Sequence, residues 1–194
     1  SRVYRLRSVQ YENMSRYDDA VAIARTSLAQ FGVSFPDSPE ETEAALEREI
    51  QSIQCLLNGR SIESLIDLPV MTDPATRMVM NTLTDIWSSA YILGDPILAR
   101  LISATMVRLS LVHGNAAESA YGYVTHAITV GPVREDYRSA YEFGRLALEV
   151  NERFNDSKRR AKIHQQFHAH VSLWRRPMLE CLPYAREACR SGLE

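Results

Sequence analysis

The histidines near the C-terminal end have the spacing that comes closest to a metal site. His164 and His168 are four residues apart, so on a helix both side chains point to the same side, as two metal ligands would. His170 points well away from them, and no carboxylate lies at a matching spacing to supply a third ligand. Residues 162–170 are typical of a solvated helix face. The pattern therefore predicts no metal site.

Cysteines and acidic residues are the next candidates for chemistry. Cys181 and Cys189 are eight residues apart, too far along one straight helix to share a metal ion, and we interpret both as small core residues. Five carboxylates fall on the polar side of one amphipathic segment, near a helix N-terminus that favours negative charge: Glu40, Glu41, Glu43, Glu47 and Glu49. No pattern supplies a pocket that would separate their pKa values for acid–base catalysis.

Nucleophilic and phosphate chemistry also lack their usual sequence marks. Ser61 and Ser64 have no histidine placed by a recognisable nucleophile motif. No glycine-rich loop ends in Lys-Ser or Lys-Thr, and the chain has only two lysines, Lys158 and Lys162, so we expect no ATPase chemistry. We predict no catalytic, cofactor-binding or metal-ligating residue, no bound cofactor, and no enzymatic activity of this chain itself.

The composition describes a folded protein with little net charge. The 194 residues are 45% hydrophobic and carry a formal net charge of −2, which excludes intrinsic disorder and disfavours nucleic-acid binding. The basic run 158–162 is interpreted as an exposed helical turn, with contact to an acidic partner as the alternative. No run of 18 apolar residues occurs, so we expect no membrane partner. Three cysteines fit a reducing, cytoplasmic compartment.

Helix start and stop signals divide the chain. Asp73-Pro74 and Asp95-Pro96 each pair an N-cap acid with proline at the first helical position, and Ser38 with Glu41 forms a capping box. Looser start signals are Ser15 with Asp18 and Asn115 with Glu118. Glycines that follow periodic segments predict helix ends at Gly32, Gly59, Gly94, Gly114, Gly131 and Gly192.

Apolar residues between these signals recur at helical spacing, and no stretch alternates with period two long enough to predict a strand. We expect an all-α protein with about eight or nine helices, some of them short, over 2–13, 16–31, 39–58, 61–66, 74–93, 96–113, 116–130, 133–152, 157–173 and 177–191. The segment 96–113 is apolar most of the way round, which places it between neighbouring helices in the middle of an array.

A repeated pattern predicts how the helices pair. Residues 17–25 and 137–145 share Tyr, Ala and a small residue followed by Arg at the same offsets, and Leu28 matches Leu148. A fainter copy, Ala185-Arg186, follows Gly144-Arg145 by 41 residues. Small residues at such offsets let two antiparallel helices approach closely. The pattern predicts stacked helical hairpins of about 34–45 residues, with coincidence as the alternative.

Six stretches, in this order and spacing, carry a family resemblance: 31–36, 59–74, 90–96, 106–115, 119–121 and 141–148. Together they resemble the long helical region of very large multidomain signalling kinases of bacteria and fungi. In that family the region lies between an AAA-type, STAND-like ATPase module and downstream GAF and histidine-kinase modules, often behind a serine/threonine-kinase-like domain. The resemblance covers about residues 17–194.

The resemblance implies a TPR-like α-solenoid that acts as a scaffold and interaction module, because the family's catalytic residues lie in other modules. The strict tetratricopeptide signature is absent, so the identity of a peptide groove does not follow from it. We expect 1–194 to be a single helical-repeat domain from a longer protein, since the chain starts at Ser1 without an initiator methionine. The expected partner is a protein, either neighbouring modules or a signalling partner.

Two other classes of function remain open at this point. The first is a small-ligand-binding all-α sensor with a pocket near Trp87, Tyr91 and Tyr121, although aromatic residues at helical spacing usually belong to the core. The second is an all-α enzyme, for which the sequence offers no coherent site.

Overall fold

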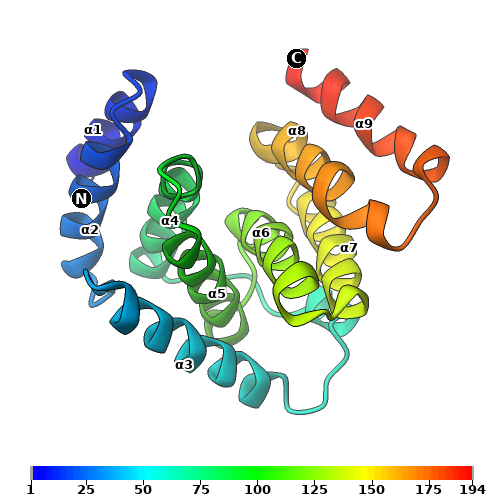
Figure 1. Cartoon of the computed structure of the whole chain (residues 1–194), viewed down its shortest axis with the longest axis horizontal. Helices are drawn as coiled ribbons and strands as arrows, with labels where there is room; N and C mark the ends of the chain where they lie inside the picture. The colour runs from blue at the N-terminus through cyan, green and yellow to red at the C-terminus, as the bar shows by residue number, and fades with distance from the viewer. Residues whose placement is uncertain (1, 194) are drawn as a thin grey trace. The chain divides into compact units, whose positions relative to one another are not determined.

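The computed structural model describes residues 2–193 and is built from helices. Figure 1 shows the helices in chain order. Within residues 2–193 there is no β-sheet, and a single bridge joins Val70 to Asn115. The all-α helical-repeat prediction is confirmed. The helices are α1 (Arg2–Asn13), α2 (Tyr17–Ala29), α3 (Pro39–Leu57), η1 (Glu63–Asp67), α4 (Pro74–Ile92), α5 (Pro96–His113), α6 (Ala117–Arg134), α7 (Tyr137–Arg153), α8 (Ser157–Gln166), η2 (Phe167–Val171), η3 (Ser172–Trp174) and α9 (Met178–Leu193).

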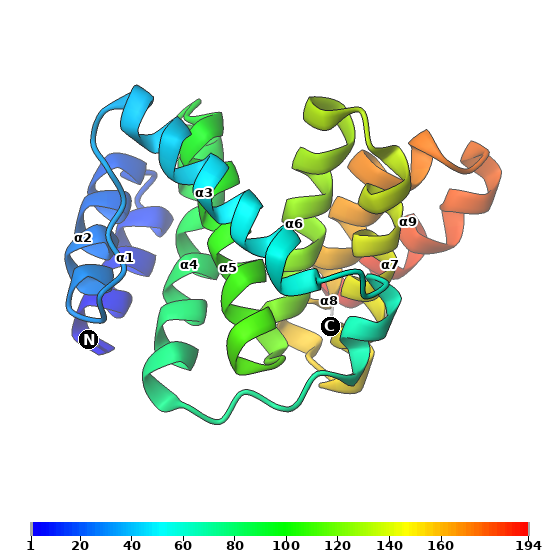
Figure 2. The ribbon, with the colours of Figure 1, turned by 90° about the horizontal axis from the view of Figure 1, so that it is seen from below.

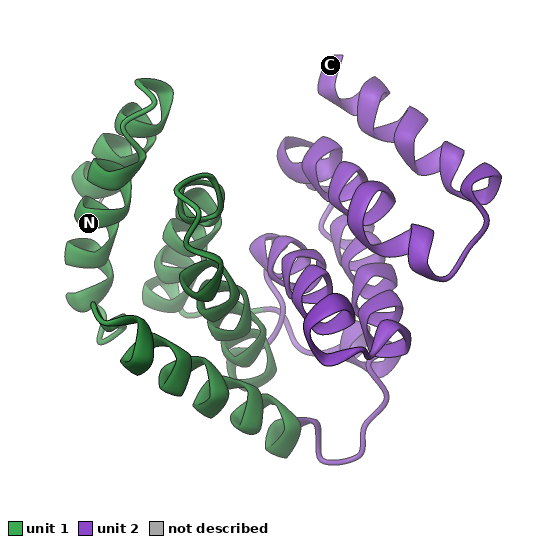
Figure 3. Cartoon of the chain, viewed as in Figure 1, with its two compact units in different colours: residues 1–56, 71–113 green, residues 57–70, 114–194 purple. Residues whose placement is uncertain are grey.

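The chain forms two compact units, coloured separately in Figure 3. Unit 1 contains residues 1–56 and 71–113, and unit 2 contains residues 57–70 and 114–194. Each unit is therefore made from two pieces of chain. The expectation of one domain over 1–194 stays a prediction.

Unit 1 contains two helical hairpins. α1 packs on α2 and α4 packs on α5, while α2 also contacts α4; Figure 2 shows both pairs side by side. The first copy of the repeated pattern lies where α1 meets α2. Ala20, Ala24 and Leu28 are buried there, and the buried Ser8 hydroxyl of α1 donates to the Ala20 carbonyl oxygen (3.1 Å). The small residues permit the close approach that the pattern predicts.

Unit 2 repeats this arrangement with α6 against α7 and α8 against α9. A Cβ atom placed on Gly131 of α6 would lie 3.3 Å from the Ala140 Cβ of α7. A Cβ atom on Gly144 would lie 2.7 Å from the Phe167 ring and 2.9 Å from Val171. The second copy of the pattern therefore also marks close helix approach, which agrees with its predicted role.

The segment after α8 departs from the single helix predicted over 157–173. The α-helix ends at Gln166, and residues 167–171 form a π-helical turn, η2, followed by the 3₁₀ turn η3. Phe167 and Val171 lie at the two ends of this π turn, and both approach the bare backbone of Gly144. Such π turns are rare, and the apolar spacing of the sequence did not predict this one.

Three helix starts are confirmed and two are wrong. Asp73 Oδ2 accepts from the Thr76 amide (2.8 Å), Asp95 Oδ1 from the Leu98 amide (2.9 Å), and Ser38 Oγ from the Glu41 amide (3.1 Å). Ser15 does not cap α2; it has a left-handed backbone (φ 56°), and Arg16 is the N-cap. Asn115 does not cap α6, because its side chain is buried in other hydrogen bonds and Ala116 is the N-cap.

Four of the six glycine helix ends are confirmed by positive φ angles, at Gly32, Gly59, Gly94 and Gly114. The predictions at Gly131 and Gly192 are wrong, since both lie inside helices. Gly131 serves helix packing instead, and α6 ends at Arg134, with Glu135 (φ 56°) as its C-cap. α7 therefore begins at Tyr137 rather than near 133, with Asp136 accepting from the Ser139 amide (3.0 Å).

α5 is buried most of the way round, as its composition predicts. Among the described residues it is the one helix long and apolar enough to cross a membrane by length and composition, and 61% of its 18 residues are buried within the structure.

Candidate functional site

A groove of about 340 Å³ opens in unit 1 between α3, α5 and the segment that follows α2. α3 lines it with one face, through Ala45, Arg48, Glu49 and Ser52. α5 supplies Leu101, Thr105 and Arg108, which also share one helix face, and the segment 32–35 closes one side. The helices thus bring together charged, hydroxyl and apolar side chains that lie far apart in the sequence.

The charges of this α3–α5 groove do not cancel. Arg108 Nε donates to Glu49 Oε2 across the two helices (2.5 Å), and both side chains are partly buried. Arg48, one residue before Glu49, is exposed and forms no ion pair within residues 2–193. Two guanidinium groups and one carboxylate leave the groove with one positive charge at neutral pH.

Thr105 gives the groove a polar atom without a partner. Its side chain is 2% exposed, and its hydroxyl makes no hydrogen bond within residues 2–193. Ser103 and Ser110 on the same helix donate to the carbonyl oxygens of Ala99 (3.0 Å) and Met106 (2.9 Å). A serine or threonine hydroxyl in a helix often donates to the carbonyl oxygen four residues earlier. Thr105 differs from its neighbours because its buried hydroxyl has no such bond, at a cost of about 1–3 kcal/mol.

A second pocket, of about 220 Å³, continues along α5. Leu109 and His113 of α5 line it together with Asp73 and Thr76 at the start of α4. Val33 borders both this pocket and the α3–α5 groove. Neither pocket was predicted from the sequence, because neither the position of segment 32–35 nor the missing partner of Thr105 follows from helical spacing.

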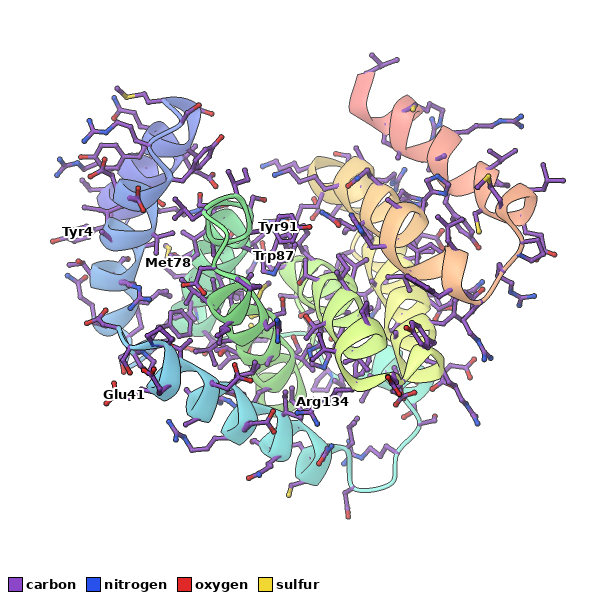
Figure 4. The ribbon with its side chains drawn as sticks, in the orientation of Figure 1. Tyr4, Glu41, Met78, Trp87, Tyr91 and Arg134 are labelled. Carbon is purple, nitrogen blue, oxygen red and sulfur yellow. The ribbon has the colours of Figure 1, made fainter. Side chains whose placement is uncertain are left out.

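The aromatic residues predicted to surround a ligand belong largely to the packing. The Trp87 indole is buried and donates from Nε1 to Ser103 Oγ (2.8 Å). Tyr91 stacks on it with ring centroids 5.3 Å apart and is 55% exposed; Figure 4 labels both on α4. Tyr121 is buried in unit 2. Trp87 and Tyr121 thus have the core role that helical spacing predicts as the alternative.

The histidine segment is not the solvated helix face that we expected. Phe167 is fully buried, and His164 and His168 are half-buried, each with a Nδ1 atom that lacks a partner within residues 2–193. Burial lowers the pKa of His164 and of His170. The His164 ring lies 6.3 Å from that of Tyr184. In the described part of the chain, no three His, Cys, Asp or Glu residues are arranged to hold a metal ion.

The two C-terminal cysteines differ. Cys181 is buried, with its Sγ 3.4 Å from the Pro177 carbonyl oxygen, so its prediction as a core residue is confirmed. The same prediction is wrong for Cys189, which is exposed because it lies on the outer side of α9.

A buried ion cluster in unit 2 involves the basic run. Arg159 Nη2 donates to Glu118 Oε1 (2.8 Å), and Arg159 Nη1 donates to Asp156 Oδ2 (2.6 Å). The three side chains are 14%, 6% and 7% exposed, in that order. Asp156 also accepts from the Lys158 amide and caps α8. The interpretation of 158–162 as a solvated turn is therefore wrong at Arg159, whose side chain holds two buried carboxylates.

His126 of α6 is the most deeply buried histidine, and it predicts a pH dependence of stability. Burial, with a smaller effect of Arg134, lowers the pKa of His126 from 6.5 to about 4. Between these values the unfolded chain binds a proton that the folded chain does not, so stability falls as pH drops from 6.5 to 4. The shift corresponds to about 3 kcal/mol. His164 and His170 act in the same direction.

We therefore expect His126→Phe to flatten the plot of unfolding free energy against pH between 6.5 and 4.5, measured by urea denaturation. Phenylalanine retains the edge-on contact with Phe143, where the ring centroids lie 5.1 Å apart. The measured quantity is the slope, so a uniform change in stability does not affect the comparison. An unchanged slope would contradict the assignment to His126.

Exposed apolar side chains gather at the C-terminal end of unit 2. We define the C-terminal apolar surface by Leu173, Trp174, Met178, Leu179 and Leu182, of which Leu179 is 79% exposed. Trp174 contacts Tyr137 (ring centroids 5.2 Å apart) yet is 60% exposed. Beside this surface, the Arg176 guanidinium lies over the Tyr141 ring, 5.7 Å from its centroid.

Comparison with known proteins adds no relative: the chain matches no protein-family model, no curated protein and no solved structure.

Proposed function

We propose that this chain is a non-catalytic helical-repeat scaffold that binds another polypeptide. The hairpins of both units support the proposal, since stacked hairpins offer extended surfaces rather than a reaction site. The observation that carries it is the C-terminal apolar surface, where five large apolar side chains remain at least partly open to solvent on η3 and α9. Exposed apolar surface marks interaction sites when it is extensive, and this surface supports such a role.

The scaffold is proposed to belong to a multidomain signalling kinase. This part of the proposal is supported by the ordered sequence resemblance. It is an analogy with a protein family and does not rest on the chemistry of a site in this chain. In this proposal the helical region docks neighbouring ATPase and kinase modules or a signalling partner in the cytoplasm. The nucleotide state of the ATPase would then bias the docking and so the release of the kinase.

Site-specific photo-crosslinking tests the scaffold function in the full-length natural polypeptide. A benzophenone amino acid at Leu179 is expected to give discrete crosslinked products, either within the polypeptide or to one partner, which peptide mapping identifies. The matched control places the same group at Glu43, an exposed polar position on α3. Equal crosslinking at both positions would contradict the proposal, as would ATP hydrolysis that stays with the purified chain through successive columns.

A sensor of small ligands is the second candidate, and the α3–α5 groove favours it. The groove offers a charged rim and the unsatisfied hydroxyl of Thr105. A helical-repeat protein can both bind a ligand and hold a partner, so this second function does not exclude the first.

A further inference from the structure

We infer that the α3–α5 groove of unit 1 binds the carboxylate of a ligand whose remaining body is apolar. The groove is formed entirely within unit 1, so the inference is independent of the C-terminal apolar surface of unit 2. Its volume of about 340 Å³ is within the range of small-molecule pockets, roughly 300–1,000 Å³.

Charge selects an anion. Arg48 and Arg108 line the groove with one acidic residue, Glu49, which leaves one positive charge to be matched. Arg108 uses its Nε–H for Glu49, which leaves the N–H groups of its two Nη atoms as the donors that could bind a ligand. A carboxylate carries the single negative charge that is needed, whereas a phosphate monoester at neutral pH carries about 1.5–2 charges.

Thr105 fixes where the carboxylate would be held. Its hydroxyl is buried, unlike those of exposed threonines, and it lacks the bond to the preceding turn that Ser103 and Ser110 make. A carboxylate oxygen would accept a hydrogen bond from this hydroxyl group. Binding would thus supply the partner that the folded chain leaves out.

The walls of the groove select the rest of the ligand. Val33 and Phe35 of the closing segment and Leu101 of α5 present apolar surface beside the two arginines. A ligand with a carboxylate at one end and an apolar body can contact both kinds of surface at once. This chemistry is shared by free apolar carboxylic acids and by the C-terminal residue of a polypeptide.

Titration of the whole chain with N-acetyl-L-phenylalanine tests the inference. Binding is detected by changes in the backbone amide chemical shifts in NMR spectra. The matched probe is N-acetyl-L-phenylalaninamide, which keeps the apolar body and lacks the negative charge. We expect saturable shifts at Val33, Ser52 and Thr105 with the acid, and at least tenfold weaker binding of the amide. The free acid of N-acetyl-Ala-Ala-Phe separates the two sources: tighter binding than the single residue indicates a polypeptide C-terminus, and equal binding a free acid.

Two variants locate the site. Arg48→Gln is expected to weaken binding of the acid at least tenfold, and Thr105→Val several-fold, with no change for the amide. Valine keeps the shape of threonine, so thermal unfolding of Thr105→Val should show an intact fold. Arg77→Gln, at an exposed arginine of α4, is the control and should bind like the unaltered chain. The inference is overturned by equal affinity for acid and amide, by unchanged affinity in Arg48→Gln, or by no saturable shift up to 10 mM probe.

Discussion

Gly114→Ala is expected to lower the free energy of unfolding by about 4 kcal/mol, the sum of a left-handed backbone cost and lost buried hydrogen bonds. Gly114 has φ 93°, and an added Cβ would lie 2.2 Å from the carbonyl oxygen of Pro69. That oxygen accepts from the Asn115 amide (2.7 Å), so it cannot move away without breaking this bond. A fall in midpoint temperature of about 10 °C, followed by circular dichroism, is the corresponding measurement.

A shift of the backbone at Gly114 would also disturb the hydrogen bonds of the neighbouring Asn115 side chain. Its Nδ2 donates to the Leu65 carbonyl oxygen (2.8 Å), and its Oδ1 accepts from the Tyr123 hydroxyl (2.8 Å), all within the core of unit 2. Gly94→Ala is the matched control, because Gly94 also has positive φ (74°) but open space where the Cβ would be. We expect it to cost about 1–2 kcal/mol. Equal losses in the two variants would show that the Pro69 contact is unimportant.

Arg159→Met is expected to cost about 3–5 kcal/mol at neutral pH, because it leaves two buried carboxylates without their counter-charge. Glu118 and Asp156 both accept hydrogen bonds from this guanidinium, and Glu118 Oε2 already lacks a partner within residues 2–193. Methionine retains much of the apolar length of arginine, so the variant removes mainly the charge. Urea unfolding monitored by circular dichroism measures the loss.

Arg160→Met is the matched control for this prediction. Arg160 follows Arg159 on α8, and its one side-chain hydrogen bond within residues 2–193 is a long one to Asn155 Oδ1 (3.5 Å), so its replacement should cost less than about 0.5 kcal/mol. Adding Glu118→Met to Arg159→Met should recover part of the loss, since apolar pairs often replace buried ion pairs without cost. Similar stability of Arg159→Met and Arg160→Met would contradict the role given to the ion cluster.

Helical spacing and capping chemistry predicted the all-α class and most helix positions, because both depend on residues within one or two turns of each other. Asp73 and Asp95 cap their helices because the stabilising bonds are local. Ser15 and Asn115 carry the same local signal but are used differently. The Asn115 side chain donates instead to the carbonyl oxygen of Leu65, fifty residues earlier in the chain. Rules based on neighbouring residues cannot predict such a distant partner.

The candidate site was largely beyond prediction for the same reason. Arg159 belongs to a charged run whose composition predicts solvent exposure, and only the position of Glu118 on a different helix shows that its side chain is largely shielded from solvent. Thr105 lies in an apolar helix where a hydroxyl ordinarily bonds to its own helix, so its missing partner is invisible in the sequence. One side of the α3–α5 groove is formed by segment 32–35. This segment is not helical, so helical spacing could not predict where it lies relative to α5.

The two-piece origin of unit 2 has a consequence for synthesis of the chain. Residues 57–70 leave the ribosome before the whole of 71–113, yet η1 packs on α7, and Arg153 of α7 donates to the carbonyl oxygens of Ile66 and Leu68. At translation rates of about 5–20 residues per second, Leu65 waits on the order of ten seconds for the helix that covers it. During that interval the nascent chain exposes an apolar segment that the folded unit 2 buries.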